Sequence, residues 1–314
     1  MSNHDPIFTQ CMHQFNNTCT TLFLQTPYEW QTAVGSTILV AHTTKTSICQ
    51  LLVRPTNVGK NLVSIATAAC IKGITLCICP LLILVSDQYQ IFIAKTSSDR
   101  SITCFHLDEL SPHEVDNVLL PKLTALSPSQ TVMIFTSPHC LLRCCYTVLE
   151  TFVVMKLIRF VVVGEVHLVN NFGQSFREEF PALREPISDK LTTAPILLMT
   201  ATCTHRIRYS IQTMLGLKIT STHWPCAQEM KHCSIYFDAH YSTHPMSYVT
   251  KSIKPFVTAR NGLVDKVIIY ANAAKSIVNF ATKLGGIMDK DVVLTDIDIA
   301  AVIGRMKRGA KAET

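Results

Sequence analysis

Short apolar runs without polar alternation recur along the first two-thirds of the chain. They cover residues 50–53, 74–79, 131–136, 160–164 and 196–200. Runs of this kind, rich in leucine and β-branched residues, are typical of strands that are covered on both faces, as in a parallel sheet. The pattern therefore predicts five buried strands at these positions.

Helix-like segments lie between the apolar runs. The segment NLVSIATAACIKG (61–73) ends at Gly73, which we expect to cap the helix. Farther along, Ser111 and Glu114 have the spacing of a capping box, which predicts a helix start. Alternation of strands and helices predicts an α/β fold with a doubly wound parallel sheet.

A polar, irregular stretch then interrupts the pattern, and an apolar strand-like run, KVIIYAN (266–272), follows it. We expect four parts: an N-terminal extension (1–24), a first α/β domain (25–220), a linker (221–235) and a partial second α/β domain (236–314). About 80 residues follow the linker, which is short for a complete α/β domain.

Composition favours a folded chain without a membrane span. Of 314 residues, 48% are apolar and 16% are charged, which suffices for substantial cores and is unlike disordered sequence. The longest apolar run, Ile74–Val85, holds 12 residues and a proline, whereas a membrane-spanning helix needs about 20. The N-terminus lacks the pattern of a targeting segment.

The 13 cysteines include no CxxC pair, so neither structural zinc nor a disulfide framework is expected. Several, such as Cys70, Cys77 and Cys79, fall inside apolar runs and are predicted to be core residues. The net charge of +6 is concentrated from Lys251 onward, and the tail GRMKRGAKAET is either a contact for nucleic acid or a solvated end.

The stretch RPTNVGKN follows the first apolar run, where open α/β sheets bind ligands. Gly59 and Lys60 suit a phosphate-binding loop, in which a lysine contacts the β- and γ-phosphates. Asn57 tolerates a left-handed backbone, whereas Val58 resists it. Asn61 stands where a hydroxyl residue would contact Mg²⁺. The same residues also fit a Gly-Lys turn that leads into a helix.

Two further strand ends carry candidate chemistry. After the fourth run, GEVH places Glu165 where a carboxylate orients the attacking water in ATP hydrolysis, or forms a salt bridge. Gly164 stands where an aspartate would hold Mg²⁺. After the fifth run, Thr200 and Thr202 supply small hydroxyl groups that relay contacts between nucleotide and nucleic acid, although such a turn is ordinary by itself.

Taken in order, these blocks resemble superfamily 2 nucleic-acid helicases, and specifically the RecQ-like DNA helicases. EWQTAVGSTIL (29–39) is similar to the segment before the phosphate loop, and CICPLLILVSDQ (77–88) is similar to motif Ia. IFTSPHCLL (134–142) resembles the segment that contacts the DNA backbone. VVVGEVH resembles the motif with the DEAH box, and LLMTATCT resembles motif III.

The segment LVNNFGQSFREEFPAL (168–183) resembles the aromatic-rich loop that RecQ proteins carry after the DEAH box. Phe172, Gly173, Phe176 and Arg177 match its framework. In the family this loop couples single-strand binding to hydrolysis, and stacking of bases on aromatic rings gives the physical reason. Core packing is the alternative role for these aromatic residues.

The resemblance implies a RecA-like doubly wound parallel sheet of the P-loop NTPase type, followed by a partial second RecA-like domain. It implies ATP and Mg²⁺ as cofactors, single-stranded or forked DNA as partner, a nuclear location, and a role in DNA repair and recombination. It assigns catalysis to Lys60, Glu165 and His167.

The resemblance also assigns binding roles. The residues that it places at ATP, with Gln31 at the adenine, are Gln31, Thr56, Asn57, Val58, Gly59, Lys60 and Asn61. Those that it places in coupling to DNA are Phe172, Phe176, Arg177, Thr200 and Thr202. The metal contacts that it leaves are Asn61 and Glu165.

The chain departs from the family pattern at Val58, Asn61 and Gly164, which weakens the expected Mg²⁺ site. Neither the family's late arginine motifs nor its zinc-binding and winged-helix segments are found. We therefore keep three hypotheses: an ATP-dependent 3′–5′ DNA helicase, a degenerate and truncated remnant that binds nucleotide or DNA without turnover, and a decaying gene product without a selected function.

Overall fold

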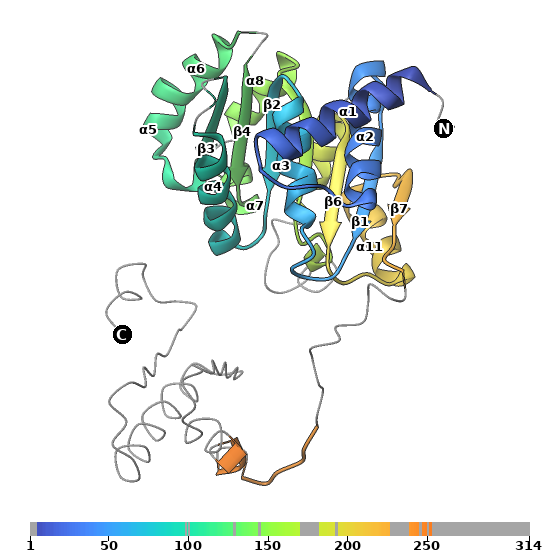
Figure 1. Ribbon diagram of the computed structural model, residues 1–314. Helices are drawn as coiled ribbons and strands as arrows, with labels where there is room; N and C mark the ends of the chain where they lie inside the picture. Colours follow the sequence, from blue (N-terminus) through green and yellow to red (C-terminus); the bar gives the residue numbers. More distant parts are fainter. Residues whose placement is uncertain are drawn as a thin grey trace, which may run out of the picture. The chain divides into compact units, whose positions relative to one another are not determined.

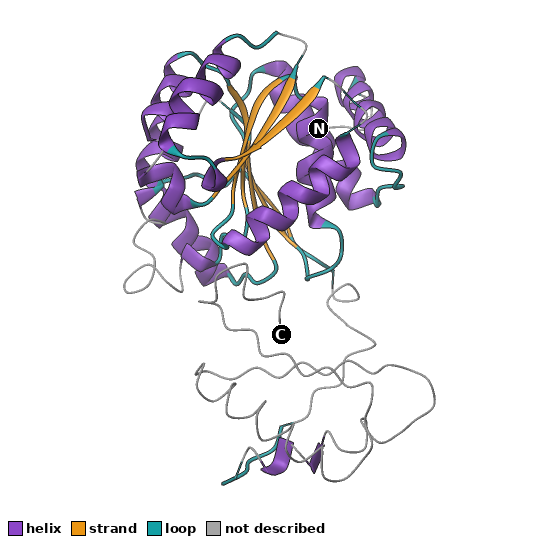
Figure 2. Ribbon diagram, turned by 90° about the vertical axis from the view of Figure 1, so that its left-hand side faces the viewer, coloured by secondary structure: helices purple, strands orange, loops and turns teal. Residues whose placement is uncertain are grey.

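The computed structural model contains a seven-stranded, wholly parallel sheet, with helices on both faces (Figures 1 and 2). The order of its strands is β3-β4-β2-β5-β6-β1-β7. The structure describes residues 5–97, 99, 101–127, 130–143, 146–169, 182–191, 194–226, 239–244, 247–249 and 251–252. The strands are β1 (Cys49–Val53), β2 (Gly73–Ile78), β3 (Ile102–His106), β4 (Thr131–Thr136), β5 (Ile158–Val163), β6 (Ile196–Thr200) and β7 (Ser221–His223).

All five predicted strands are confirmed, with ends that agree within two residues. β1, β4 and β6 are buried along their whole length, and β2 and β5 along all but one position. Strands that are buried on both faces cannot alternate apolar and polar residues, which explains the continuous runs. The predicted doubly wound α/β fold is therefore confirmed.

Two strands were missed because neither has an apolar run. β3 is an edge strand whose burial is mixed, and it pairs with β4 alone. β7 has three residues, all half-buried, and it pairs with β1 at the opposite edge. Its sequence, Ser-Thr-His, carries no strand signal, so only the pairing of Gln50 with Ser221 and of Leu52 with His223 reveals it.

The two faces of the sheet carry different helices. Alternate strand residues such as Leu52, Cys77 and Val162 pack with helices α1 to α4, whereas Leu51, Leu76 and their counterparts pack with the other set. The first set is α1 (Pro6–Thr21), α2 (Glu29–Thr44), α3 (Lys60–Cys70) and α4 (Leu82–Thr96). The second set is η1 (Leu107–Glu109), η2 (Val115–Leu119), α6 (Leu120–Thr124), α7 (Pro138–Arg143), α8 (Tyr146–Val154), η3 (Glu185–Lys190) and α11 (His205–Leu215).

Helix starts and ends test two of the predictions. The predicted capping box is confirmed at the short helix α5 (Pro112–Glu114), where the amide of Ser111 donates to Glu114 and the amide of Glu114 donates back to the Ser111 hydroxyl. The predicted cap at Gly73 is wrong. Helix α3 ends at Cys70, and Gly73 begins β2 with a φ of 110°, a conformation that favours glycine.

Helix α1 belongs to the first compact part of the fold, although we expected residues 1–24 to be an extension. It crosses α2 where Gly35 has no side chain, and the buried ring of Phe15 fills that space. A Cβ at Gly35 would lie 2.3 Å from the Phe15 ring. The close crossing therefore depends on the glycine.

The chain divides into two compact units, Met1–His232 and Cys233–Thr314. The first unit ends within the stretch 221–235 that we expected to be a linker, because β7 extends the sheet there. The predicted strand 266–272 and the basic tail lie outside the described residues. The predicted core thiols are confirmed, since Cys70, Cys77 and Cys79 are all buried. Burial raises the pKa of Cys70 to about 11, so its thiol is protonated at neutral pH.

Candidate nucleotide site at the carboxyl edge of the sheet

The loop between β1 and α3 contains two residues in the left-handed backbone conformation. Asn57 has a φ of 62° and Gly59 has a φ of 82°, so both adopt the left-handed conformation. Val58 keeps a negative φ, and the difficulty that we expected there does not arise. The left-handed positions fall on an asparagine and a glycine, the residue types that tolerate them best. Thr56 and Asn57 form an exposed turn.

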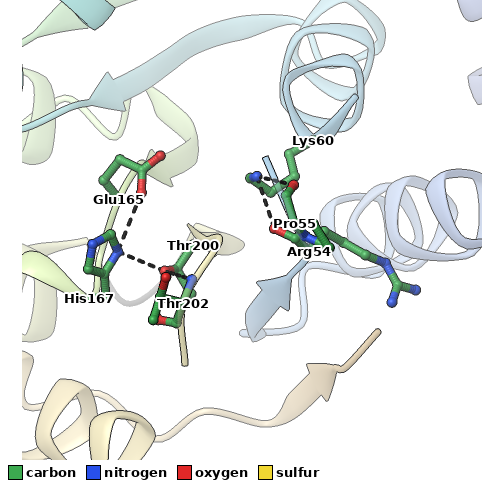
Figure 3. Close-up of polar contacts among 7 residues, drawn as sticks. All are labelled: Arg54, Pro55, Lys60, Glu165, His167, Thr200 and Thr202. Carbon is green, nitrogen blue, oxygen red and sulfur yellow. Dashed lines mark hydrogen bonds and ion pairs between the residues drawn. The ribbon is translucent and has the colours of Figure 1, made fainter. Parts of the chain in front are cut away.

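Lys60 begins helix α3 and turns its ammonium group back into this loop (Figure 3). Its Nζ donates to the carbonyl oxygen of Arg54 at 3.0 Å and to that of Pro55 at 2.7 Å. Burial lowers the pKa of Lys60, and the negative charge of Glu165 acts in the opposite direction. The ammonium group is thus held at the loop by carbonyl oxygens, which phosphate oxygens could replace.

Gln31 supports the loop from helix α2 and is 2% exposed. Its Nε2 donates to the carbonyl oxygen of Gly59 at 2.9 Å, and its Oε1 accepts from the amide of Tyr28 at 2.7 Å. Both ends of the side-chain amide are therefore engaged, one with the loop and one with the start of the helix. Recognition of adenine by Gln31 stays a prediction.

The ends of β5 and β6 carry a connected set of polar groups. His167 Nδ1 lies 3.4 Å from Glu165 Oε2 and 2.8 Å from Thr200 Oγ1 (Figure 3). The Thr200 hydroxyl donates to the carbonyl oxygen of Thr202 at 3.0 Å and accepts from the amide of Thr202 at 3.0 Å. Because that hydroxyl proton is already used, the contact with His167 requires a proton on Nδ1.

Two features mark this strand end as unusual. Glu165 has a φ of 45°, a conformation that costs a non-glycine residue about 1–2 kcal/mol and often occurs at functional sites. Burial lowers the pKa of His167, although Glu165 opposes this effect. The neutral imidazole therefore carries its proton on Nδ1 and leaves Nε2 as an acceptor.

These groups lie close together because their strands are neighbours. β5, β6 and β1 are adjacent in the sheet and all parallel, so their carboxyl ends share one edge. The amide of Arg54 also donates to the carbonyl oxygen of Thr200 at 3.1 Å, which ties the loop after β1 to the end of β6. The structure thus brings together Lys60, Glu165, His167, Thr200 and Thr202, as the sequence predicts.

The donors available to a metal ion are few. Asn61 is exposed in the first turn of α3, and Glu165 supplies the carboxylate. Within the described part of the chain, no cluster of three His, Cys, Asp or Glu side chains could hold an ion by itself. Such a set fits only an Mg²⁺ that phosphate oxygens and water also bind, which is the usual arrangement with nucleotides.

Gly164 contributes no ligand, yet there is room for one. A Cβ at this position would lie 3.6 Å from Cys79 Sγ and 3.8 Å from the Ile78 carbonyl oxygen, which are ordinary contacts. The backbone of Gly164 has no positive φ. An aspartate could therefore be introduced here without displacing the sheet.

Two groups of predicted nucleic-acid contacts differ in outcome. Phe172, Phe176 and Arg177 lie outside the described residues. In the segment 134–142, Ser137 is buried, and both its amide and its hydroxyl donate to the carboxylate of Asp108. The Ser137 hydroxyl also accepts from the amide of Cys140 at 3.1 Å, so this serine binds the protein rather than facing solvent.

Arg54 was not among the predicted site residues. Its side chain is 6% exposed, and its Nη1 donates to the carbonyl oxygen of Trp224 at 2.7 Å. Its guanidinium carbon lies 4.8 Å from the centre of the Trp30 ring. The position of an arginine directly after a buried strand is the one sequence feature that could have pointed to Arg54. The residues that Arg54 contacts are distant in sequence, so they give no local pattern.

Comparison with known proteins gives RecQ-like DNA helicases among the sequence relatives. The chain is 27% identical to the ATP-dependent DNA helicase Q5 of Rattus norvegicus over 190 residues, 60% of this chain. It is 28% identical to the ATP-dependent DNA helicase RecQ of Pasteurella multocida over 177 residues, 54% of this chain. The resemblance to RecQ-like helicases is thereby confirmed. No protein-family model matches the chain.

The RecQ-like relatives are much longer than this chain. The matched region covers 18% of the rat protein and 25% of the Pasteurella protein. The ATP-dependent DNA helicase Q1 of Mus musculus, 29% identical over 168 residues, is covered to 24%. The activities in these names belong to the whole relatives.

Solved structures share the fold. The helicase MrfA bound to DNA has a TM-score of 0.59 at 13% identity, covering 89% of this chain and 39% of its own. Dbp5 of S. cerevisiae bound to RNA and ADP BeF3 has a TM-score of 0.55 at 12% identity, covering 90% and 65%. At such low identity the likeness concerns the fold alone, and the RecA-like sheet is confirmed. None of the described helices combines the length and the hydropathy that crossing a bilayer requires.

Proposed function

We propose that this chain acts as an ATP-dependent 3′–5′ DNA helicase of the RecQ type. The observation that carries the proposal is the arrangement at the carboxyl edge of β1, β5 and β6. There a phosphate loop with Lys60 lies beside the connected set of Glu165, His167 and Thr200. The RecQ-like relatives are named as ATP-dependent DNA helicases, which supports the same reading.

Lys60 and the loop would bind the nucleotide phosphates. The left-handed conformations of Asn57 and Gly59 turn the loop toward the first turn of α3, where backbone N–H groups favour anions. The Lys60 ammonium group would exchange the carbonyl oxygens of Arg54 and Pro55 for phosphate oxygens. Gln31 would hold the loop through Gly59 and contact the adenine.

Glu165 would orient the water that attacks the γ-phosphate. Its side chain is 26% exposed, so water can reach the carboxylate. The Nδ1–H of His167 faces both this carboxylate and the Thr200 hydroxyl, and Thr200 passes the contact to the backbone of Thr202. A movement of the Glu165 carboxylate would therefore alter the hydrogen bonds that position the loop after β6.

Mg²⁺ bound with the nucleotide would neutralise charge on the β- and γ-phosphates. The residues that would contact it are Asn61, through a neutral amide oxygen, and Glu165. DNA, single-stranded or forked, would contact the region beyond Thr202 and the loop with Phe172, Phe176 and Arg177. The cell nucleus is the location that this proposal implies.

A steady-state ATPase assay with single-stranded DNA tests the proposal. The expected result is turnover that DNA stimulates and that Lys60→Ala lowers by about 10²–10³. Lys60→Arg is a matched control for charge, since it keeps a cation but not the compact ammonium group. Turnover equal to that of Lys60→Ala, with and without DNA, would overturn the proposal.

The alternative is a protein that binds nucleotide or DNA without turnover. Gly164 and Asn61 favour it, because neither supplies a charged ligand for the metal. The double variant Asn61→Ser with Gly164→Asp discriminates the two functions. Under the alternative, the restored protein hydrolyses ATP and the natural sequence does not. ATP hydrolysis by the natural sequence at the same rate as by the double variant would exclude the alternative.

A further inference from the structure

Arg54 stands between the phosphate loop and the segment by which the chain leaves the sheet. It follows the last residue of β1 and is almost completely buried. A buried guanidinium group is unfavourable unless its N–H groups and charge are matched. Here Nη1 donates to the carbonyl oxygen of Trp224, and the charge lies over the ring of Trp30. Both contacts involve residues that the proposed catalytic steps do not use.

The backbone of Arg54 joins the two other parts of the site. Its carbonyl oxygen accepts from the Lys60 ammonium group at 3.0 Å, and its amide donates to the carbonyl oxygen of Thr200 at 3.1 Å. The same residue therefore contacts the phosphate-binding lysine through its backbone and Trp224 through its side chain. Movement of Lys60 from carbonyl oxygen to phosphate would remove one of the hydrogen bonds that fix this backbone.

Among the described residues, β1 and α11 also contact the segment that leads to Trp224. β7 pairs with β1 over three residues, and all three are half-buried. Trp224 follows β7 directly, and its ring lies 5.4 Å from that of His205 at the start of α11. Arg208, also on α11, donates from Nε to the Thr222 hydroxyl at 3.0 Å. A short edge strand of this kind depends on side-chain contacts for its position.

Trp30 ties the same arginine to the nucleotide side of the site. It precedes Gln31, whose amide holds the carbonyl oxygen of Gly59 in the phosphate loop. The exposed ring of Tyr28 stacks on Trp30, with 6.4 Å between ring centres and 14° between planes. Arg54 thus contacts helix α2 on one side and the exit from β7 on the other.

We infer that Arg54 is a positioning residue that couples occupancy of the phosphate loop to the hold on the exit segment at Trp224. The inference rests on the proposed function, because it requires nucleotide to draw Lys60 away from the Arg54 carbonyl oxygen. The geometry supplies a continuous path: Lys60 to the Arg54 backbone, and the Arg54 side chain to Trp224. In the sequence, Trp224 precedes the second compact unit, which begins at Cys233.

The two tryptophans of the chain make this coupling measurable, because both contact Arg54. In a Trp30→Phe variant, tryptophan emission comes from Trp224 alone. ADP is the probe, since it is not turned over, and its binding is measured independently by equilibrium dialysis. The expected result is a change in Trp224 emission that saturates with the dialysis curve.

Three variants in the Trp30→Phe background complete the test. Arg54→Gln is expected to retain ADP binding and lose the emission change. Arg54→Lys is a milder change, because it keeps the positive charge but not the planar guanidinium group. This variant is expected to lose most of the emission change. Arg208→Gln is the matched control, because it removes another arginine contact to β7 without touching the phosphate loop. It is expected to keep the emission change.

The outcomes separate this inference from the proposed function. ADP binding without a change in Trp224 emission would overturn the inference and leave the proposed function standing. The same conclusion would follow if ADP changed Trp224 emission in both Arg54 variants as much as it does with Arg54 present. Equal loss in Arg54→Gln and Arg208→Gln would overturn it too, because the effect would then come from a loosened β7. Absence of ADP binding by dialysis would overturn the proposed function, and the inference with it.

Discussion

The imidazole Nδ1 of His167 lies 2.8 Å from the hydroxyl oxygen of Thr200, and this contact joins the end of β5 to the end of β6. Thr200 is fully buried, and its hydroxyl also bonds to both backbone groups of Thr202. One hydroxyl therefore serves three partners. The carboxylate of Glu165 reaches the same imidazole nitrogen at 3.4 Å. This single hydroxyl group connects the imidazole of His167 to the loop after β6.

Thr200→Val should break the connection while preserving the shape of the side chain. His167 Nδ1 and the amide of Thr202 would lose their partner, at about 1–3 kcal/mol of unfolding free energy. We expect DNA stimulation of ATPase activity to disappear while the dissociation constant for ADP stays within about twofold. Urea unfolding, ATPase assays and dialysis measure the three quantities.

Thr202→Val is the control for that variant, because Thr202 takes part through its backbone and its side chain is exposed. It should leave both stability and DNA stimulation unchanged. If Thr202→Val and Thr200→Val lose DNA stimulation equally, the hydroxyl of Thr200 is not the connecting group.

Stability should decline as pH falls below neutrality. Burial lowers the pKa values of His42, His167 and His223 below 6.5, so these groups bind protons more readily when the chain is unfolded. The unfolding free energy that these histidines contribute is fully present above pH 6.5. It is lost as the pH falls from 6.5 toward their lower pKa values in the folded state. The slope per histidine cannot exceed about 1.4 kcal/mol per pH unit. Urea unfolding between pH values of about 7.5 and 5.5 measures it.

His167→Asn tests the share of one histidine in that slope. The amide nitrogen of asparagine can donate to Thr200 as Nδ1 does, but it does not titrate. The variant should therefore show a shallower decline of unfolding free energy with falling pH. A decline as steep as that of the natural protein would assign the effect to the other histidines.

Gly35→Ala should loosen the packing of α1 against α2. The added methyl group would overlap the Phe15 ring, so the ring or one of the helices must shift. Overpacking of this kind costs about 1–3 kcal/mol. The unfolding free energy measures the loss. Phe15→Leu combined with Gly35→Ala should recover part of it, and a double variant less stable than both single variants would contradict the packing account.

Gly164→Asp should be accepted by the fold and should raise ATP turnover. Its Cβ would make only ordinary contacts with Cys79 and Ile78, so the unfolding free energy should change by less than about 1 kcal/mol. The carboxylate would add a charged ligand for the proposed Mg²⁺, and the rate at limiting Mg²⁺ should rise. Gly164→Asn, of the same shape but neutral, is the control. Equal rates for both variants would show that charge at this position does not matter.

Continuous apolar runs predicted the five central strands because burial on both faces leaves no polar positions. β3 and β7 were not predicted, since an edge strand needs no such run and Ser-Thr-His has no strand signal at all. The pairing that creates β7 joins residues such as Gln50 and Ser221. Local sequence carries no information about a partner so far away.

Within the site, the residue types at the strand ends predicted which groups would meet. Gly59, Lys60, Glu165 and Thr200 follow or end neighbouring strands of the parallel sheet, and the fold brings them to one edge. The contacts of Arg54 could not be predicted. Its contact with Trp224 spans 170 positions in sequence and depends on a strand that was not foreseen.

DNA-stimulated ATP turnover by the natural sequence decides whether this chain is a DNA-dependent ATPase. The rate of phosphate release is measured with and without single-stranded DNA for the natural protein, Lys60→Ala and Glu165→Gln. We expect stimulated release by the natural protein and a loss of about 10²–10³ in both variants. Release that is the same in all three proteins, with no response to DNA, would contradict it.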